Sequence, residues 1–260
     1  GGFADTINFI ITSTLSTADT VTGGAGTDIL SIIDAGALDA DFTNVTTIEH
    51  LKLATASTVT LGVQASEAGI ATVTTVAAGV YVIDASAMTT ATTFATATAG
   101  AANIVTISLG GGGHTLTLPT TGSKDVVSIN ASTLTSSTDS ITNFLEGTGD
   151  VDTITLTGLT VANLRGSGTD LDTDGGTLNA GMNTNTGVLT SSVANADLTV
   201  ALAVTNLANY EGGIAVSDIV ANDAFYYIMD NSIDSAMFFF SDTDGGADVD
   251  AGEVVKVLTI

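Results

Sequence analysis

Cysteine and tryptophan are absent from this chain of 260 residues, and proline occurs once, at Pro119. Without cysteine, disulfide bonds and zinc sites built on thiolates are excluded. We therefore expect the fold to be held together by its core or by a different metal. No apolar run approaches the ~20 residues that a membrane-spanning helix needs, so we expect no membrane insertion. The chain lacks an initiator Met and a basic leader, which predicts a processed chain or a fragment.

Basic residues are nearly absent too. Four Lys and Arg stand against 28 Asp and Glu, and the formal net charge is −24. Nucleic acids and anionic membrane surfaces both require a basic face, so these two classes of partner are excluded. Two interpretations of the acidic excess remain: solubility in salt water, where charge is screened, or binding of divalent cations. The clustering of the acids in loops favours cation binding.

Groups suited to catalysis are few. The two histidines, His50 and His114, exclude a His-rich metal site, and we expect His50 to be an exposed strand residue. Four glycines, Gly110 to Gly113, precede His114, but no Lys-Ser/Thr pair follows them, which excludes a P-loop. There is no G-x-S-x-G elbow, and the scattered basic residues do not suit a polysaccharide lyase groove. We therefore expect that the chain is not an enzyme.

Short alternating runs rich in Thr, Val, Ala, Gly and Ser dominate the chain and predict an all-β fold. A β-sandwich and an elongated parallel β-solenoid both suit such runs. Aromatic residues make up only 5% of the chain and hairpin turns are scarce before residue 190, which favours the solenoid. Single helical turns are expected within 34–40 and 63–70. The predicted strands are 57–61, 71–76, 80–84, 103–109, 114–118, 125–130, 140–144, 152–157 and 197–204.

The composition changes near residue 190. Phe225 to Met229 and Met237 to Phe240 are dense apolar runs that predict buried antiparallel strands. We therefore expect a β-solenoid-like repeat region over 1–190 and a compact antiparallel β module over 191–260.

Residues 23–31, GGAGTDILS, match the glycine-rich nonapeptide G-G-x-G-x-D-x-U-x, in which U is a large apolar residue. Asp19, nine residues before Asp28, begins half of a preceding repeat. Glycines permit turns with positive φ that expose carbonyl oxygens, and calcium prefers six to eight oxygen ligands. A plain Gly/Asp hairpin turn is the alternative. The candidate calcium ligands are Asp19, Gly23, Gly24, Gly26 and Asp28.

Three further acidic loops are candidate calcium sites. In the loop at 146–154, Asp150 and Asp152 are the expected ligands. The loop at 170–176 begins like an EF-hand but has Gly181 where the final Glu would stand, so a looser calcium turn and a solvated loop both remain open. The loop at 242–253 places acids at EF-hand positions 1, 3, 7, 9 and 12 between predicted strands, which indicates a strand–loop–strand calcium site or an acidic hairpin tip. The acids of these last two loops are Asp170, Asp172, Asp174, Asp242, Asp244, Asp248, Asp250 and Glu253.

Three segments, 12–31, 42–53 and 238–258, resemble RTX-type S-layer and β-strand-repeat surface proteins of bacteria. The resemblance implies type I secretion, an extracellular location at the bacterial cell surface, and a calcium-stabilised structural protein that assembles into a lattice or filament. Its implied partners are further copies of itself and calcium ions, with cell-surface polysaccharide as a further candidate. The alternative is a calcium-dependent adhesin module that binds a glycan or a surface.

Overall fold

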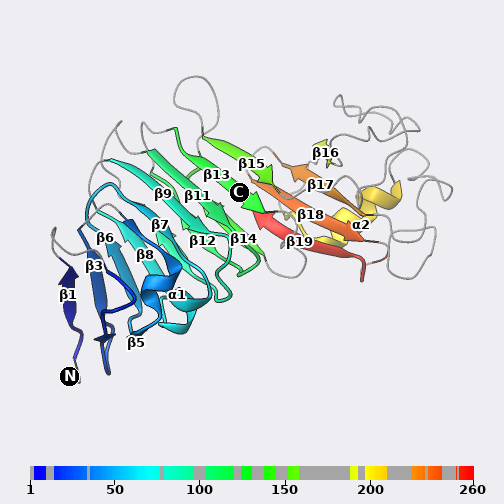
Figure 1. Ribbon diagram of the computed structural model, residues 1–260. Helices are drawn as coiled ribbons and strands as arrows, with labels where there is room; N and C mark the ends of the chain where they lie inside the picture. Colours follow the sequence, from blue (N-terminus) through cyan, green and yellow to red (C-terminus); the bar gives the residue numbers. More distant parts are fainter. Residues whose placement is uncertain are drawn as a thin grey trace. The chain divides into compact units, whose positions relative to one another are not determined.

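The structure is a computed structural model that forms two compact units, Gly1–Thr133 with Asp139–Thr157, and Leu134–Thr138 with Gly158–Ile260. The first unit is a parallel β-solenoid and the second contains an antiparallel sheet and a helix (Figure 1). The predicted all-β fold, a solenoid followed by an antiparallel module, is confirmed. The structure describes residues 3–9, 15–33, 36–76, 79–96, 104–119, 124–130, 138–144, 152–157, 188–192, 197–209, 224–231, 234–241, 250 and 252–260. The predicted boundary near residue 190 stays a prediction.

Two parallel sheets run along the solenoid, because its successive coils contribute strands to both. In the first sheet the solenoid strands pair in the order β1 (Thr6–Phe9), β3 (Ile29–Ile32), β6 (His50–Leu53), β8 (Thr72–Thr75), β10 (Thr93–Ala95), β12 (Thr115–Thr117) and β14 (Asp139–Thr142). In the second sheet the order is β4 (Gly36–Ala37), β7 (Thr58–Thr60), β9 (Val80–Ala85), β11 (Ile104–Leu109), β13 (Val126–Asn130) and β15 (Thr153–Thr157). Two short strands, β2 (Val21–Thr22) and β5 (Val45–Thr46), pair parallel with each other in a separate small sheet.

The coils of the first sheet are 21 to 25 residues long, as shown by register partners from Ile29 with His50 to Thr115 with Ser140. The nine-residue spacing between Asp19 and Asp28 therefore falls within one coil. Residues that stack on one another come from positions more than twenty apart in the sequence.

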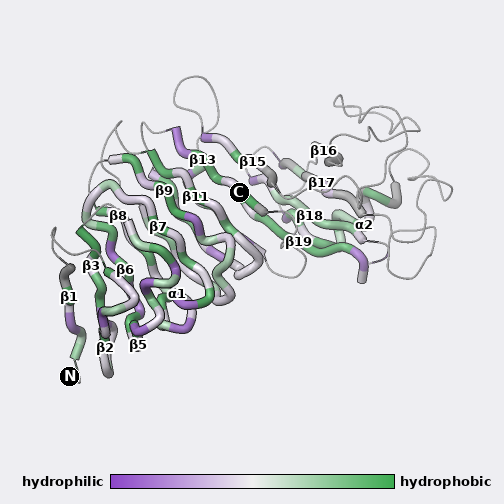
Figure 2. The backbone as a smooth tube through the Cα atoms, viewed as in Figure 1, coloured by the Kyte–Doolittle hydropathy of each residue, from purple (hydrophilic) through white to green (hydrophobic). Residues whose placement is uncertain are grey.

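The solenoid core consists of aliphatic columns, because in-register strands place equivalent side chains ~4.8 Å apart along the axis. Buried and more exposed residues alternate along strands such as β6 and β9. Hydrophobic and hydrophilic residues both lie along the solenoid strands (Figure 2). Leu, Ile and Val predominate at this spacing, and single aromatic side chains such as Phe94 are also buried there. One inward column, in register through the first sheet, is Leu30, Leu51, Val73, Phe94, Leu116 and Ile141.

Two helical turns interrupt the solenoid, η1 (Asp39–Phe42) and α1 (Val63–Glu67), near the predicted positions. A five-residue helix is marginal by itself. Asp39 supports it from the preceding coil: Oδ1 accepts the N–H groups of Gly62 and Ala65 at 2.7 and 3.0 Å, and Oδ2 that of Gln64 at 3.2 Å. Within the described residues no helix is long and apolar enough to cross a membrane.

In the second unit β16 (Val188–Ser192) pairs parallel with β17 (Ala224–Asp230), and β17, β18 (Ser235–Ser241) and β19 (Val254–Thr259) pair antiparallel. The two predicted apolar strands are confirmed as β17 and β18. The strand predicted over 197–204 is wrong, because helix α2 covers Val200–Asn209. Its buried Ala203 and Leu207 stand four residues apart, a helical spacing, and the Thr199 hydroxyl caps the helix by accepting the N–H of Leu202.

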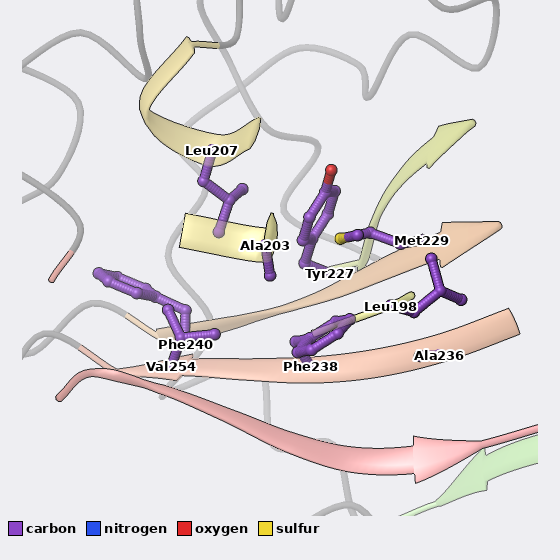
Figure 3. Packing of buried hydrophobic residues seen from close by; sticks show 9 residues of the cluster. All are labelled: Leu198, Ala203, Leu207, Tyr227, Met229, Ala236, Phe238, Phe240 and Val254. Atoms are coloured by element: carbon purple, nitrogen blue, oxygen red, sulfur yellow. The ribbon is translucent and has the colours of Figure 1, made fainter. Parts of the chain in front are cut away.

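The core of the second unit is built on aromatic side chains (Figure 3). Tyr227 and Phe238 face each other across β17 and β18, with ring centroids 6.4 Å apart. Lys256 joins β19 to the segment before α2 by donating to the carbonyl of Leu198 at 2.9 Å. The cluster comprises Leu198, Ala203, Leu207, Tyr227, Met229, Ala236, Phe238, Phe240 and Val254.

Candidate metal site

Acidic side chains form a column at one corner of the solenoid. Asp5, Asp28 and Glu49 each stand immediately before a strand of the first sheet. Oδ1 of Asp28 accepts the backbone N–H of Asp5 at 2.7 Å, and Oε2 of Glu49 accepts that of Asp28 at 2.8 Å. Asp28 and Glu49 therefore each accept a hydrogen bond from a backbone N–H of the preceding coil. Asp28, the acid of the nonapeptide, is fully buried in this position.

The glycine turn before Asp28 folds against the next coil. Gly24 and Gly26 have φ of 105° and 127°, in the left-handed region that favours glycine. The N–H of Gly24 donates to the hydroxyl of Thr47 at 2.8 Å, and the N–H of Gly23 donates to the carbonyl of Thr46 at 3.2 Å. The glycines of the motif therefore let the backbone of the turn hydrogen-bond to Thr46 and Thr47 in the next coil.

Two oxygen atoms lie close to Gly23. A Cβ on Gly23 would overlap the carbonyl oxygen of Thr47 and lie 2.5 Å from Oδ2 of Asp28. That Oδ2 atom is buried and has no hydrogen-bond partner among the described residues. An unpaired buried carboxylate oxygen is costly, and a cation between it and a carbonyl oxygen would offset the cost. The residues at Gly23 therefore fit a hard, oxygen-seeking cation.

The carboxylate of Asp19 closes a separate turn. Its Oδ2 accepts the backbone N–H and the hydroxyl of Ser16, both at 2.9 Å. Among the described residues no three His, Asp or Glu side chains gather into a group that could hold a metal. A cation beside Gly23 would consequently depend on backbone oxygens for most of its ligands, and the carbonyls of Gly23, Gly24 and Gly26 remain the predicted ones.

A second carboxylate column lies at the start of the strands of the second sheet. Oδ1 of Asp125 accepts the N–H of Val105 at 2.7 Å, and Oδ1 of Asp152 accepts the N–H of Asp125 at 3.0 Å. Both aspartates are buried. Asp152, a predicted metal ligand, thus has a structural role of the same kind as Asp28.

His114 and Asp139 lie at the start of two strands of the first sheet, as Asp5, Asp28 and Glu49 do. Asp139 Oδ1 accepts the backbone N–H of His114 at 2.6 Å, and the His114 ring packs edge-on against Phe94 with centroids 5.7 Å apart. Burial lowers the pKa of His114 to about 4. Burial raises the pKa of Asp139 to about 7, partly opposed by the hydrogen bond from the His114 N–H. Sequence reasoning missed this pair, although His114 precedes β12 just as Asp28 precedes β3.

The last acidic loop is described only at its end. The N–H of Asp250 donates to Oε2 of Glu253 at 3.2 Å, and the N–H of Glu253 donates to the carbonyl of Asp250 at 3.0 Å. Asp250 is exposed, whereas Glu253 is buried just before β19. The other predicted ligands, Asp150, Asp170, Asp172, Asp174, Asp242, Asp244 and Asp248, lie outside the described residues.

Comparison of the chain with models of known protein families, with curated proteins and with solved structures found no match. The geometry of its own residues is therefore the basis of the functional proposal.

Proposed function

We propose that this chain is an extracellular structural protein of a bacterial cell surface that self-assembles into a surface layer or filament and is stabilised by calcium. The observation that supports the proposal most directly is the pair of oxygens beside Gly23, the buried Oδ2 of Asp28 and the carbonyl of Thr47. The resemblance to RTX-type surface proteins adds type I secretion to the proposal.

Calcium suits this position better than magnesium does. Calcium accepts six to eight oxygens in flexible geometry, whereas magnesium demands a near-octahedral set and keeps its water. Asp28 and the carbonyl of Thr47 would hold the ion, and it would link the glycine turn to the following coil. A ligand at about 100 times its dissociation constant stabilises a fold by about 2.7 kcal/mol.

Charge connects calcium to assembly. Four basic side chains cannot neutralise 28 acids across repeated contacts between copies. Bridging cations would reduce that repulsion, and a stacked solenoid offers regular surfaces for repeated contact. Calcium would thus act both within the chain and between chains.

A calcium titration of the full chain tests the proposal. We expect calcium to raise the melting temperature and light scattering, chelation to reverse both, and sodium chloride at matched ionic strength to imitate the scattering only in part. An unchanged melting curve in excess chelator would contradict the role of calcium. A protein that stays monomeric at high concentration in millimolar calcium would favour the adhesin alternative.

Two matched variants test the site itself. Asp28→Asn and Asp125→Asn both remove a buried charge and keep an oxygen that can accept the same backbone N–H. We expect calorimetry to show fewer bound calcium ions for Asp28→Asn than for Asp125→Asn. Equal numbers of ions in the two variants would mean that Asp28 only supports the backbone.

A further inference from the structure

Aliphatic side chains are exposed on the outer face of the second sheet. Val80, Val82 and Ile104 are 54%, 37% and 38% exposed. Val80 and Ile104 are register partners on the adjacent strands β9 and β11, and Val82 lies two residues further on the same side of β9. The three side chains therefore form one continuous patch. Exposed apolar groups gathered in this way often mark an interaction surface.

The described surroundings of the patch carry few charges, and these are of opposite sign. Among the described outward positions flanking it, the charged side chains are one acid and one base. Asp84 has its Oδ1 held by the N–H and hydroxyl of Ser86 at 3.1 and 2.6 Å. Exposed Lys124 lies beside Ile104, two residues before the register pair Thr106 and Val126. In a chain of net charge −24, this face is one where two copies could approach with little repulsion. The outward columns in register are Thr58, Val82, Thr106, Val126 and Thr153, and Thr60, Asp84, Ser108, Ser128 and Thr155.

The outer face of the first sheet differs. Its outward positions include His50 and Lys52 on β6 and threonines on β8, β10 and β12. None of the exposed large hydrophobic residues of the described chain lies on these strands. The two outer faces therefore provide a natural pair of test and control surfaces.

We propose that two copies of this chain associate through the outer faces of their second sheets, with Val80, Val82 and Ile104 at the centre of the contact. The inference rests on the proposed self-assembly and names the surface that mediates it. A contact of a face with the same face on another copy is self-complementary, so it closes a symmetric pair.

The size of the face indicates a weak contact. Six strands spaced ~4.8 Å apart span roughly 24 Å, and strands of up to six residues reach about 20 Å. The face thus covers at most roughly 500 Å² in projection, below the ~800 Å² per partner of a standard stable interface. Because the pair is closed, a layer or filament would need a further contact of a different kind to join such pairs.

Cross-linking tests the contact directly, because the natural chain has no cysteine. Val82→Cys and Ile104→Cys place single thiols on the proposed contact, and Thr93→Cys places one at an exposed position of the first sheet. With a short bis-maleimide in calcium, we expect cross-linked dimers from the first two variants and few from Thr93→Cys. Equal yields from all three variants would overturn the proposed surface.

Charge insertion gives a second measurement. Val80→Asp with Ile104→Asp adds two charges at register partners on the proposed face, and Thr93→Asp with Thr115→Asp does the same on the first sheet. We expect at least a tenfold loss of association in the first double variant and a small change in the second, with circular dichroism confirming that both fold. If the unaltered chain associates and both double variants associate equally, this inference fails and the proposed function stands. If the unaltered chain does not associate in calcium, both fail.

Discussion

The solenoid and the antiparallel module fill their interiors with different side chains. In the solenoid, aliphatic residues such as Leu51 and Val73 stack in register, one from each coil. In the module, Tyr227, Phe238 and Phe240 form a cluster under the helix. The solenoid gains stability by repeating a small unit, whereas the module gains it from a few large side chains.

The two units place their buried acidic residues differently, since buried Glu253 of the module accepts the N–H of Asp250, only three residues away. In the solenoid, buried carboxylates such as Asp28 and Asp125 accept backbone N–H groups from the preceding coil. Part of the large negative charge is therefore structural. The comparison predicts that the solenoid responds to changes of acid, cation and pH, and that the module responds most to truncation of its aromatic core.

The largest effect is expected in the module. Phe238→Ala removes a fully buried ring and leaves a cavity, which we expect to lower the free energy of unfolding of this unit by about 3–5 kcal/mol. Chemical denaturation followed by tyrosine fluorescence measures the change. Thr93→Ala, at an exposed solenoid position, is the control and should change stability by less than about 0.5 kcal/mol. Similar losses in both variants would contradict the importance of the aromatic cluster.

In the solenoid, Gly23→Ala should have the next largest effect. The new Cβ would overlap the Thr47 carbonyl and crowd Oδ2 of Asp28, and overpacking of this kind costs about 1–3 kcal/mol. It would also displace the two oxygens proposed to bind calcium, so we expect calcium to raise the melting temperature less than in the unaltered chain. Thr93→Ala is the control, since Thr93 is exposed and lies outside every candidate calcium loop. Equal calcium responses in both variants would argue against the site.

Removal of the carboxylate that caps α1 should have a smaller effect. Asp39→Ala leaves the N–H groups of Gly62, Gln64 and Ala65 without their acceptor, at an expected cost of about 0.5–2 kcal/mol. Hydrogen exchange at these amides should accelerate. Glu67→Ala removes an equal charge from an exposed position in the same helix and should leave exchange unchanged. Equal exchange rates in the two variants would mean that α1 depends on the negative charge and not on the hydrogen bonds to Asp39.

Much of the fold could be predicted because several solenoid strands alternate and the strands of the module carry dense apolar runs. The run at 114–118 became β12, and the apolar run at 225–229 lies within β17. The run at 197–204 was predicted as a strand because its Ala, Leu and Val residues are compatible both with the alternation of a strand and with the apolar face of a helix. The Thr199 cap was the local signal that favours the helix.

The carboxylate columns were harder to find. Asp5, Asp28 and Glu49 each begin the pattern acid-x-apolar-x-apolar, but their spacings are 23 and 21 residues, whereas Asp125 and Asp152 stand 27 apart. Coils of unequal length hide such a period from a search for fixed repeats. The nine-residue motif identified Asp28 as a candidate ligand. The hydrogen bonds of Asp28, however, are made with residues of the neighbouring coils, Asp5 and Glu49.

The smallest expected effect concerns pH at His114 and Asp139, where two shifts oppose each other. The pKa of His114 falls from 6.5 to about 4, so below pH 6.5 the unfolded chain binds a proton that the folded chain does not, and stability falls as pH falls. The pKa of Asp139 rises from 3.8 to about 7, so the folded chain holds the extra proton, and stability falls as pH rises from 3.8 towards 7.

Between pH 4 and 6.5 these two contributions have opposite slopes and largely cancel, so single variants should reveal them. His114→Gln leaves Asp139 alone, and stability should then decrease as pH rises from 4 to 7. Asp139→Asn leaves His114 alone, and stability should instead decrease as pH falls from 6.5 to 4. Each group can contribute at most about 1.4 kcal/mol per pH unit. Denaturation curves at half-unit steps of pH give the free energy of unfolding. Subtracting the value of the unaltered chain at each pH cancels the contribution of the other acids. Parallel profiles for the two variants would show that neither group changes its protonation on folding, and that the solenoid's sensitivity to pH arises from its other carboxylates.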